Sequence, residues 1–179
     1  MNITISTAAG VNLALLLLRV MLGAMIAAHG LNKFFGGGKI AGTAAWFDSI
    51  GMRPGKPNAL AAATTEVGCG LLLIAGFLTP LACAGLCAVM VVAIITVHRN
   101  NGFFVFNAGQ GIEYCLVIVV AAISLGGLGA GEWSLDHATN IWHVTPGAGL
   151  AIAAILGIGG GLLQIAAFFR PSKVAAPSS

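Results

Sequence analysis

The chain has 179 residues, of which 58% are hydrophobic and only 7% are charged, and its formal net charge is +3. A soluble domain carries about 25% charged residues, so this composition cannot cover a water-exposed surface and excludes an ordinary soluble globular domain. The length suits one domain of a few spans with short loops. We therefore predict an all-α integral membrane protein whose surface faces mostly lipid.

Five apolar segments are long enough to be membrane spans. They cover residues 11–35, 58–78, 81–98, 110–128 and 148–169. The first four are expected to form a four-helix transmembrane bundle, and the last is expected to add a fifth, C-terminal transmembrane helix. Residues 1–170 then make one transmembrane domain. Residues 171–179 are small and polar, which is typical of a disordered tail.

The connections between the first three spans differ in length. Residues 41–50 include Trp46 and are too few to cross a bilayer. Since tryptophan is enriched at membrane interfaces, we predict a short interfacial helix there. The second and third spans are separated only by Thr79 and Pro80, a tight turn in which the proline can begin the next helix.

Loop cations predict the orientation in the membrane. With five spans, one side carries Lys33, Lys39, Arg53, Lys56, Arg99, Arg170 and Lys173, and the other side carries no Lys or Arg. The positive-inside rule then predicts a multi-pass protein of the cell membrane with its N-terminus outside and its C-terminus in the cytoplasm. The loop at 129–147 faces outward and carries Glu132, Trp133, Asp136, His137, Trp142 and His143.

Ionisable side chains interrupt the apolar spans. They are Arg19, His29, Glu66, His98 and Glu113. Because a charge in hydrocarbon costs at least about 3 kcal/mol, Arg19 needs a counter-charge, a carbonyl or a water-filled cavity. With a rise of about 1.5 Å per residue, the depths of Arg19 and Glu66 differ by about 6 Å, so we predict an ion pair between them. His29, Lys33, His98 and Glu113 are expected nearer the cytoplasmic edge.

Two interpretations of this polar group stay open. The side chains either pair to fix helix register, or they line a pocket accessible to protons or quinone. No tight spacing of metal ligands accompanies them, so we predict no protein-ligated metal or haem. The few cations lie at the membrane edge, which gives no support to nucleic-acid binding.

The apolar segments also contain cysteines and glycines with helical spacing. Cys69, Cys83, Cys87 and Cys115 all lie in apolar runs. Cys83 and Cys87 share a helix face, which leaves a thiol redox pair and ordinary core packing as the two interpretations. Gly157 and Gly161 form a small-xxx-small pair that indicates close helix packing, either within the chain or against another subunit.

Several short motifs occur in a specific order. They are Leu16-Leu17-Leu18-Arg19, His29-Gly30-Leu31-Asn32-Lys33, Glu66-Val67-Gly68, Leu78-Thr79, His98 followed by Asn101-Gly102-Phe103-Phe104, and Glu113-Tyr114. Over about residues 13–128, the chain resembles the DoxX family. The resemblance implies a four-helix core, and the wider group includes membrane subunits of thiosulfate:quinone oxidoreductase and proteins tied to thiol and oxidative-stress chemistry. The fifth span and the loop at 129–147 depart from the usual four-span pattern.

The resemblance implies that seven side chains are the family's characteristic polar positions. They are Arg19, His29, Lys33, Glu66, His98, Glu113 and Tyr114. We expect a membrane subunit of a redox assembly that exchanges electrons and protons with quinone or supports a soluble oxidoreductase. Its catalytic residues, Glu66 and Glu113, would handle protons, and Arg19 would stabilise an anionic quinone or substrate. His29 and His98 would donate hydrogen bonds in a pocket that also includes Lys33 and Tyr114.

The alternative hypothesis is a non-enzymatic scaffold or accessory subunit of a larger membrane complex. Both hypotheses place the chain in the lipid bilayer with other membrane or membrane-associated subunits as partners. A small-solute transporter is a third idea, but no inverted repeat accompanies it.

Overall fold

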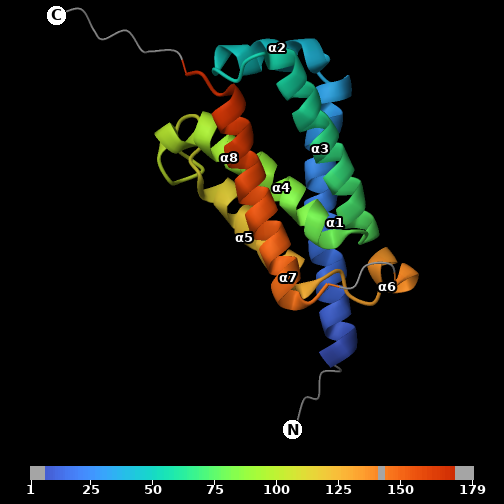
Figure 1. Cartoon of the computed structure of the whole chain (residues 1–179). Helices are drawn as coiled ribbons and strands as arrows, with labels where there is room; N and C mark the ends of the chain where they lie inside the picture. Colours follow the sequence, from blue (N-terminus) through green and yellow to red (C-terminus); the bar gives the residue numbers. More distant parts are fainter. Residues whose placement is uncertain (1–6, 141–143, 172–179) are drawn as a thin grey trace, which may run out of the picture.

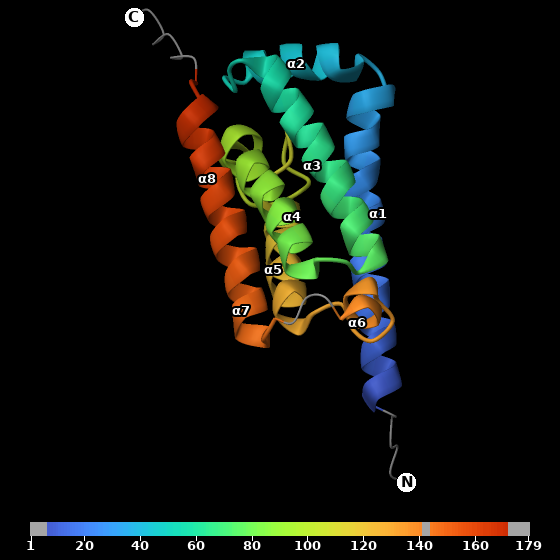
Figure 2. The same cartoon turned by 45° about the vertical axis from the view of Figure 1, so that its right-hand side comes forward.

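The computed structural model describes residues 7–140 and 144–171. Within these residues the regular elements are helices (Figures 1 and 2), and Met52 and Phe169 form an isolated β-bridge. The predicted outward-facing Trp142 and His143 lie outside the described residues, as does the tail from 172 to 179.

The helices follow the predicted apolar segments closely. They are α1 (Thr7–Phe35), α2 (Lys39–Ser49), α3 (Gly55–Ala75), α4 (Thr79–Ala93), α5 (Glu113–Leu128), α6 (Leu135–Thr139), α7 (Pro146–Ala151) and α8 (Gly157–Phe168). A π-helical turn, Ile94–His98, and a 3-10 turn, Arg99–Asn101, extend α4, and another π-helical turn, Ile152–Leu156, joins α7 to α8.

Four of these helical stretches are long and apolar enough to cross a membrane. They are Ala8–Phe35, Gly55–Ala75, Thr79–Asn101 and Pro146–Phe168. Helix α5 is apolar but has 16 residues, which extend over about 24 Å. The chain is therefore an all-helical membrane protein with four long candidate spans and one shorter apolar helix.

The fourth span was expected from about residue 110, and α5 begins at Glu113 because a compact loop occupies residues 102–112. The backbone N–H groups of Ile112 and Glu113 donate to the carbonyls of Gly102 and Phe103. The side chain of Asn101 donates to the carbonyls of Gly109 and Gln110 at 2.8 and 3.1 Å. These bonds hold the chain in a turn, so α5 begins only at Glu113.

The short helix predicted after the first span is present as α2. It lies across one end of α1 and α3 (Figures 1 and 2), and Trp46 on it is exposed. A carboxylate oxygen of Asp48 accepts a hydrogen bond from the backbone N–H of Gly55 at 2.8 Å. The α2 helix is thus fixed to the first turn of α3, whose leading N–H groups have no partner within the helix.

Glycines allow close contact between α1 and α3, which lie side by side (Figure 2). A Cβ atom added to Gly23 would lie 2.5 Å from the carbonyl oxygen of Gly70, and one added to Gly70 would lie 2.6 Å from that of Gly23. Such contacts are too short for any side chain, so these backbones meet because both positions are glycine. This contact determines the register of α1 against α3.

The predicted packing role of Gly157 and Gly161 is confirmed, and their partner is α4 of the same chain. A Cβ added to Gly157 would lie 2.4 Å from the Cβ of Cys87, and one added to Gly161 would lie 2.9 Å from the Cβ of Val91. Gly159 has no neighbour within 4 Å beyond its own helix. The α8 helix therefore packs on α4 through one glycine face.

The apolar core lies between α1, α3, α4 and α5. Its largest cluster includes Leu22, Ile26, Leu73, Leu86 and Leu125. The four cysteines are buried in the same cluster and are free thiols, which agrees with the core-packing interpretation.

Candidate functional site

A cavity of about 260 Å³ lies near the end of the molecule that carries α2. Its walls come from α1, α2, α3, the end of α4, α5 and α8, and most of them are apolar. Five of the predicted site residues line it. They are His29, Lys33, Glu66, His98 and Tyr114.

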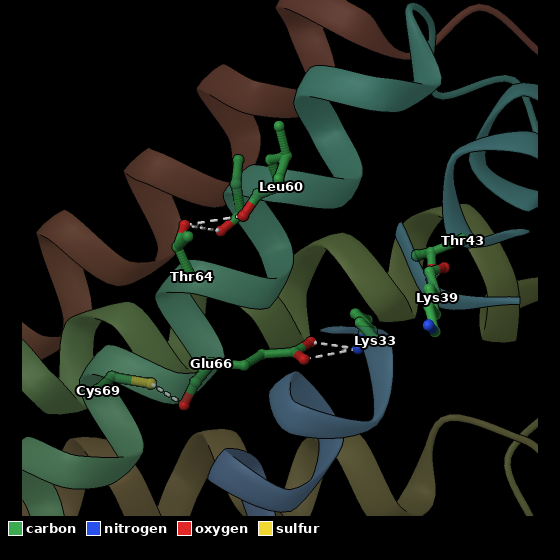
Figure 3. A network of polar contacts seen from close by, with 8 residues as sticks. Lys33, Lys39, Thr43, Leu60, Thr64, Glu66 and Cys69 are labelled. Atoms are coloured by element: carbon green, nitrogen blue, oxygen red, sulfur yellow. Dashed lines mark hydrogen bonds and ion pairs between the residues drawn. The ribbon is translucent and has the colours of Figure 1, made fainter. Parts of the chain in front are cut away.

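Lys33 and Glu66 form an ion pair at this cavity (Figure 3). The Lys33 Nζ atom lies 2.8 and 2.6 Å from the two carboxylate oxygens of Glu66. The Glu66 side chain is 5% exposed and the Lys33 side chain 19% exposed. Gly30 makes this geometry possible, because a Cβ added there would lie 2.9 Å from the Cβ of Glu66.

The predicted ion pair between Arg19 and Glu66 is wrong, and the register of α1 against α3 explains why. Gly23 lies beside Gly70, and Gly30 lies beside Glu66. Arg19 precedes Gly30 by about 16 Å along the helix, so it lies at the far end of α3 instead. The predicted depths assumed that both spans begin and end at the same two membrane surfaces, whereas α1 extends past the end of α3, so that Arg19 in the middle of α1 already lies beside the last turn of α3.

Arg19 does not line the cavity, and its partners are backbone carbonyls. The guanidinium donates hydrogen bonds to the carbonyl oxygen of Leu73 at 3.2 Å and to those of Ile74 and Trp133. Leu73 and Ile74 belong to the last turn of α3, where carbonyls lack partners within the helix and carry partial negative charge. Arg19, which is 2% exposed, therefore caps α3 and holds the segment around Trp133.

Two acidic side chains fasten the same segment. The carboxylate of Glu132 accepts a hydrogen bond from the side chain of Asn12 at 2.8 Å. The carboxylate of Asp136 accepts from the backbone N–H groups of Leu78 and Thr79 at 2.7 and 3.0 Å, which caps the start of α4. The sequence had indicated Glu132 and Asp136 only as residues of an outward-facing loop.

His98 and Glu113 lie at the loop that precedes α5. The Nδ1 atom of His98 is 2.9 Å from the carbonyl oxygen of Gln110. Because a carbonyl only accepts, Nδ1 is the donor, and in a neutral ring Nε2 is then an acceptor. Glu113 is not among the lining residues. Its carboxylate accepts from the backbone N–H of Val105 at 3.1 Å, so it stabilises the loop.

The cavity also has lining residues that the sequence analysis missed. They include Met25, Trp46, Thr65, Gln110 and Gln164. Met25 could have been found, because Met25, His29 and Lys33 are spaced four apart and share one face of α1. The other residues come from different elements, and no spacing along the chain relates them to the ionisable positions.

Tyr114 and Cys115 begin the part of α5 that lines the cavity. The Tyr114 hydroxyl contacts the sulfur of Met25 on α1. Cys115 is the one cysteine of the four among the lining residues. The sulfur of Cys87 lies 3.7 Å from the carbonyl oxygen of Val119 instead.

Among residues 7–140 and 144–171, no group of three or more His, Cys, Asp or Glu side chains could hold a metal ion.

The comparisons agree with the motifs in the first half of the chain. The family model of DoxX proteins matches residues 14–99. Over this stretch, the chain belongs to the DoxX family. The matched part contains α2, α3, most of α1 and α4, and four of the five predicted residues that line the cavity. No curated protein and no solved structure matched the chain.

Proposed function

We propose that this DoxX-family chain is a membrane subunit of a redox assembly and that its cavity binds the head group of a quinone. The observation that carries the proposal is the cavity itself. An ion pair, two histidines and a few neutral polar side chains border a mostly apolar space, as in small-molecule sites, where a few polar groups in an apolar pocket set the orientation of the ligand.

The residues present fit a quinone in chemical type. The cavity of about 260 Å³ is slightly smaller than typical small-molecule sites of roughly 300–1,000 Å³, which suits a head group whose tail remains in lipid. Lys33 offers a donor for a carbonyl oxygen, and His98 offers an acceptor for a hydroxyl. When bound, a quinone supplies reversible transfer of two electrons and two protons.

The Lys33–Glu66 pair would hold and move protons at the cavity. The Glu66 carboxylate is the acceptor and the Lys33 ammonium is the donor at the same point. Each charge offsets part of the cost of burying the other, since an isolated charge would be expensive there. A partner oxidoreductase would supply or remove the electrons.

We further propose five membrane crossings in one domain of the cell membrane, with the N-terminus outside and the C-terminus in the cytoplasm. The α5 helix would be the short crossing, completed by the loop at 102–112, whose Phe103, Phe104 and Phe106 side chains are exposed. Exposed aromatic rings favour the membrane interface. The cavity would then open towards the cytoplasmic half of the bilayer.

Tryptophan fluorescence tests the quinone site directly. Trp46 lines the cavity, and the chain has three tryptophans, so Trp133→Phe with Trp142→Phe leaves Trp46 as the reporter. In lipid nanodiscs, decylubiquinone should quench the fluorescence of Trp46, and the quenching should saturate as the quinone concentration rises. The Glu66→Gln change should raise the apparent Kd by about tenfold, as expected for the loss of a charge-assisted contact.

A matched acid at the other end of the molecule provides the control. Glu132→Gln removes one carboxylate outside the cavity and should leave the apparent Kd unchanged. Quenching that rises linearly in every variant, as for quinone dissolved in lipid alone, would contradict the proposal. A stable partner subunit recovered with such a chain would then favour the scaffold hypothesis.

A further inference from the structure

The cavity adjoins two seams between helices that are distant in the sequence. One lies between α3 and α8, where Ala61 and Gln164 are lining residues. The other lies between α1 and α5, where Met25, His29 and Tyr114 line the cavity. A ligand that is dissolved in the bilayer would have to pass one of them.

The seam between α3 and α8 is closed by several hydrogen bonds. The Gln164 side chain donates to the side-chain oxygen of Asn58 at 3.1 Å. Backbone bonds join Arg53 N–H to the Phe168 carbonyl at 2.9 Å and Arg170 N–H to the Gly51 carbonyl at 2.7 Å. The last two bonds join the end of α8 to the connection between α2 and α3. Opening this seam would break all three bonds, and replacement partners are scarce wherever lipid excludes water.

The seam between α1 and α5 has fewer polar contacts. Neither α1 and α5 nor α3 and α8 pack closely against each other, so the two seams differ in the hydrogen bonds that cross them. The polar contact across this seam is the one between the Tyr114 hydroxyl and the Met25 sulfur. Tyr114 is 46% exposed although it lines the cavity, so the cavity reaches the surface at this seam. A thioether is a weak acceptor on a flexible, unbranched side chain, so little free energy opposes its displacement.

One face of α1 leads from lipid to the ion pair past this contact. Met21, Met25, His29 and Lys33 follow one another at intervals of four residues and therefore share a stripe of the helix. Met21 is 67% exposed, whereas Lys33 is paired with Glu66. The stripe thus begins with an apolar, lipid-facing side chain and ends with a charged side chain that is paired inside the cavity.

We propose that the ligand of the cavity is a membrane-dissolved amphiphile that moves in sideways between α1 and α5, with Met25 and Tyr114 as the gate. Its polar head reaches the Lys33–Glu66 pair, and its apolar tail stays against the lipid-facing part of α1 and α5. This inference rests on the proposed quinone site and adds the route and the amphiphilic shape of the ligand.

A reversible lock across the seam tests the gate. The double change Met25→Cys and Tyr114→Cys allows a reducible bis-methanethiosulfonate reagent to join α1 to α5. In nanodiscs, the rate at which decylubiquinone quenches Trp46 should fall at least tenfold in the locked protein and recover after reduction. The control pair, Val117→Cys with Val120→Cys, takes the same reagent within α5 at exposed positions outside the cavity, so locking it should leave the rate unchanged.

The outcomes separate the two proposals. Equal quenching rates in the locked and reduced forms would overturn the gate while leaving the quinone site intact. An absence of saturable quenching in the otherwise unaltered protein would overturn the quinone site itself.

Single changes add a test that needs no reagent. Tyr114→Ala should raise the rate several-fold, and Val117→Ala, at a position 63% exposed on the same helix, should not. Equal rates in these two variants would also contradict the gate.

Discussion

The two cations of α1 that the fold encloses take different kinds of partner. Arg19 binds three backbone carbonyls, and Lys33 binds one carboxylate. The planar guanidinium has five donors in fixed directions, so it can satisfy carbonyls from two separate segments. The ammonium of lysine is a compact charge that suits a single carboxylate. Arg19 therefore has a structural role, and Lys33 belongs to the cavity.

Replacing Arg19 should test whether its role is structural. Arg19→Leu leaves the carbonyls of Leu73, Ile74 and Trp133 without their donor, and we expect a loss of about 2–3 kcal/mol in the free energy of unfolding. Proteolysis of the segment around Trp133 should also become faster. Both effects are measurable in detergent by thermal unfolding and by limited digestion. Weaker quinone quenching in a variant of unchanged stability would contradict this role and return Arg19 to the cavity.

The sequence was enough to select most of the candidate site but could not pair its members. His29, Glu66 and His98 stand out because ionisable residues are rare in apolar spans. Which side chains of the adjacent helix they contact depends on the register of one helix against the other. The predicted partner of Glu66 was Arg19, whereas the actual partner is Lys33. The prediction placed α1 too far along α3 by several residues, and this difference in register was sufficient to exchange the partners.

At the scale of elements, two glycines determine the register of α1 against α3. Gly23 and Gly70 bring the backbones of α1 and α3 together, and every other pairing between the two helices follows from this point. Glycine patterns alone did not reveal it, because the chain has 26 glycines and most of them have other roles. In the loop before α5, Gly102 and Gly109 have positive φ values of 81°, which a side chain would strain.

A neighbouring pair of glycines in α3 offers a matched test of the contact. Gly70→Ala places a Cβ 2.6 Å from the carbonyl oxygen of Gly23, whereas Gly68 has no neighbour within 4 Å beyond its own helix. Since the backbone cannot move aside easily, we expect Gly70→Ala to destabilise by about 1–3 kcal/mol. Gly68→Ala should be neutral or stabilise by up to about 1 kcal/mol, since alanine favours helix. Thermal unfolding in one detergent compares them, and equal stabilities would contradict the packing.

At the scale of the whole molecule, the two ends differ in construction. At one end, Arg19, Glu132 and Asp136 fasten the segment between α5 and α7 through hydrogen bonds. At the other end, α2 crosses the bundle (Figure 2), and two of its residues, Trp46 and Phe47, line the cavity. Apolar periodicity and turn residues were enough to predict this helix order. The cavity and the fastened segment depend on contacts between residues as far apart as Asn12 and Glu132, which no local pattern contains.

The orientation of these two ends in the membrane is the remaining prediction. The end that carries α2 also carries Lys39, Arg53 and Arg170, and the first residues of α1 lie at the opposite end (Figure 1). The positive-inside rule predicts that the end with α2 faces the cytoplasm. Two exposed residues serve as reporters, Ser49 on α2 and Thr139 on α6.

Labelling with a membrane-impermeant maleimide distinguishes the two orientations. The native cysteines are buried, so a new exposed thiol should dominate the signal. In intact cells, Thr139→Cys should react and Ser49→Cys should react only after permeabilisation. The reverse pattern would place the cavity in the outer half of the bilayer, and a partner that delivers electrons would then have to dock outside the cell. Labelling of both positions in intact cells would contradict any arrangement in which α2 and α6 lie on opposite sides.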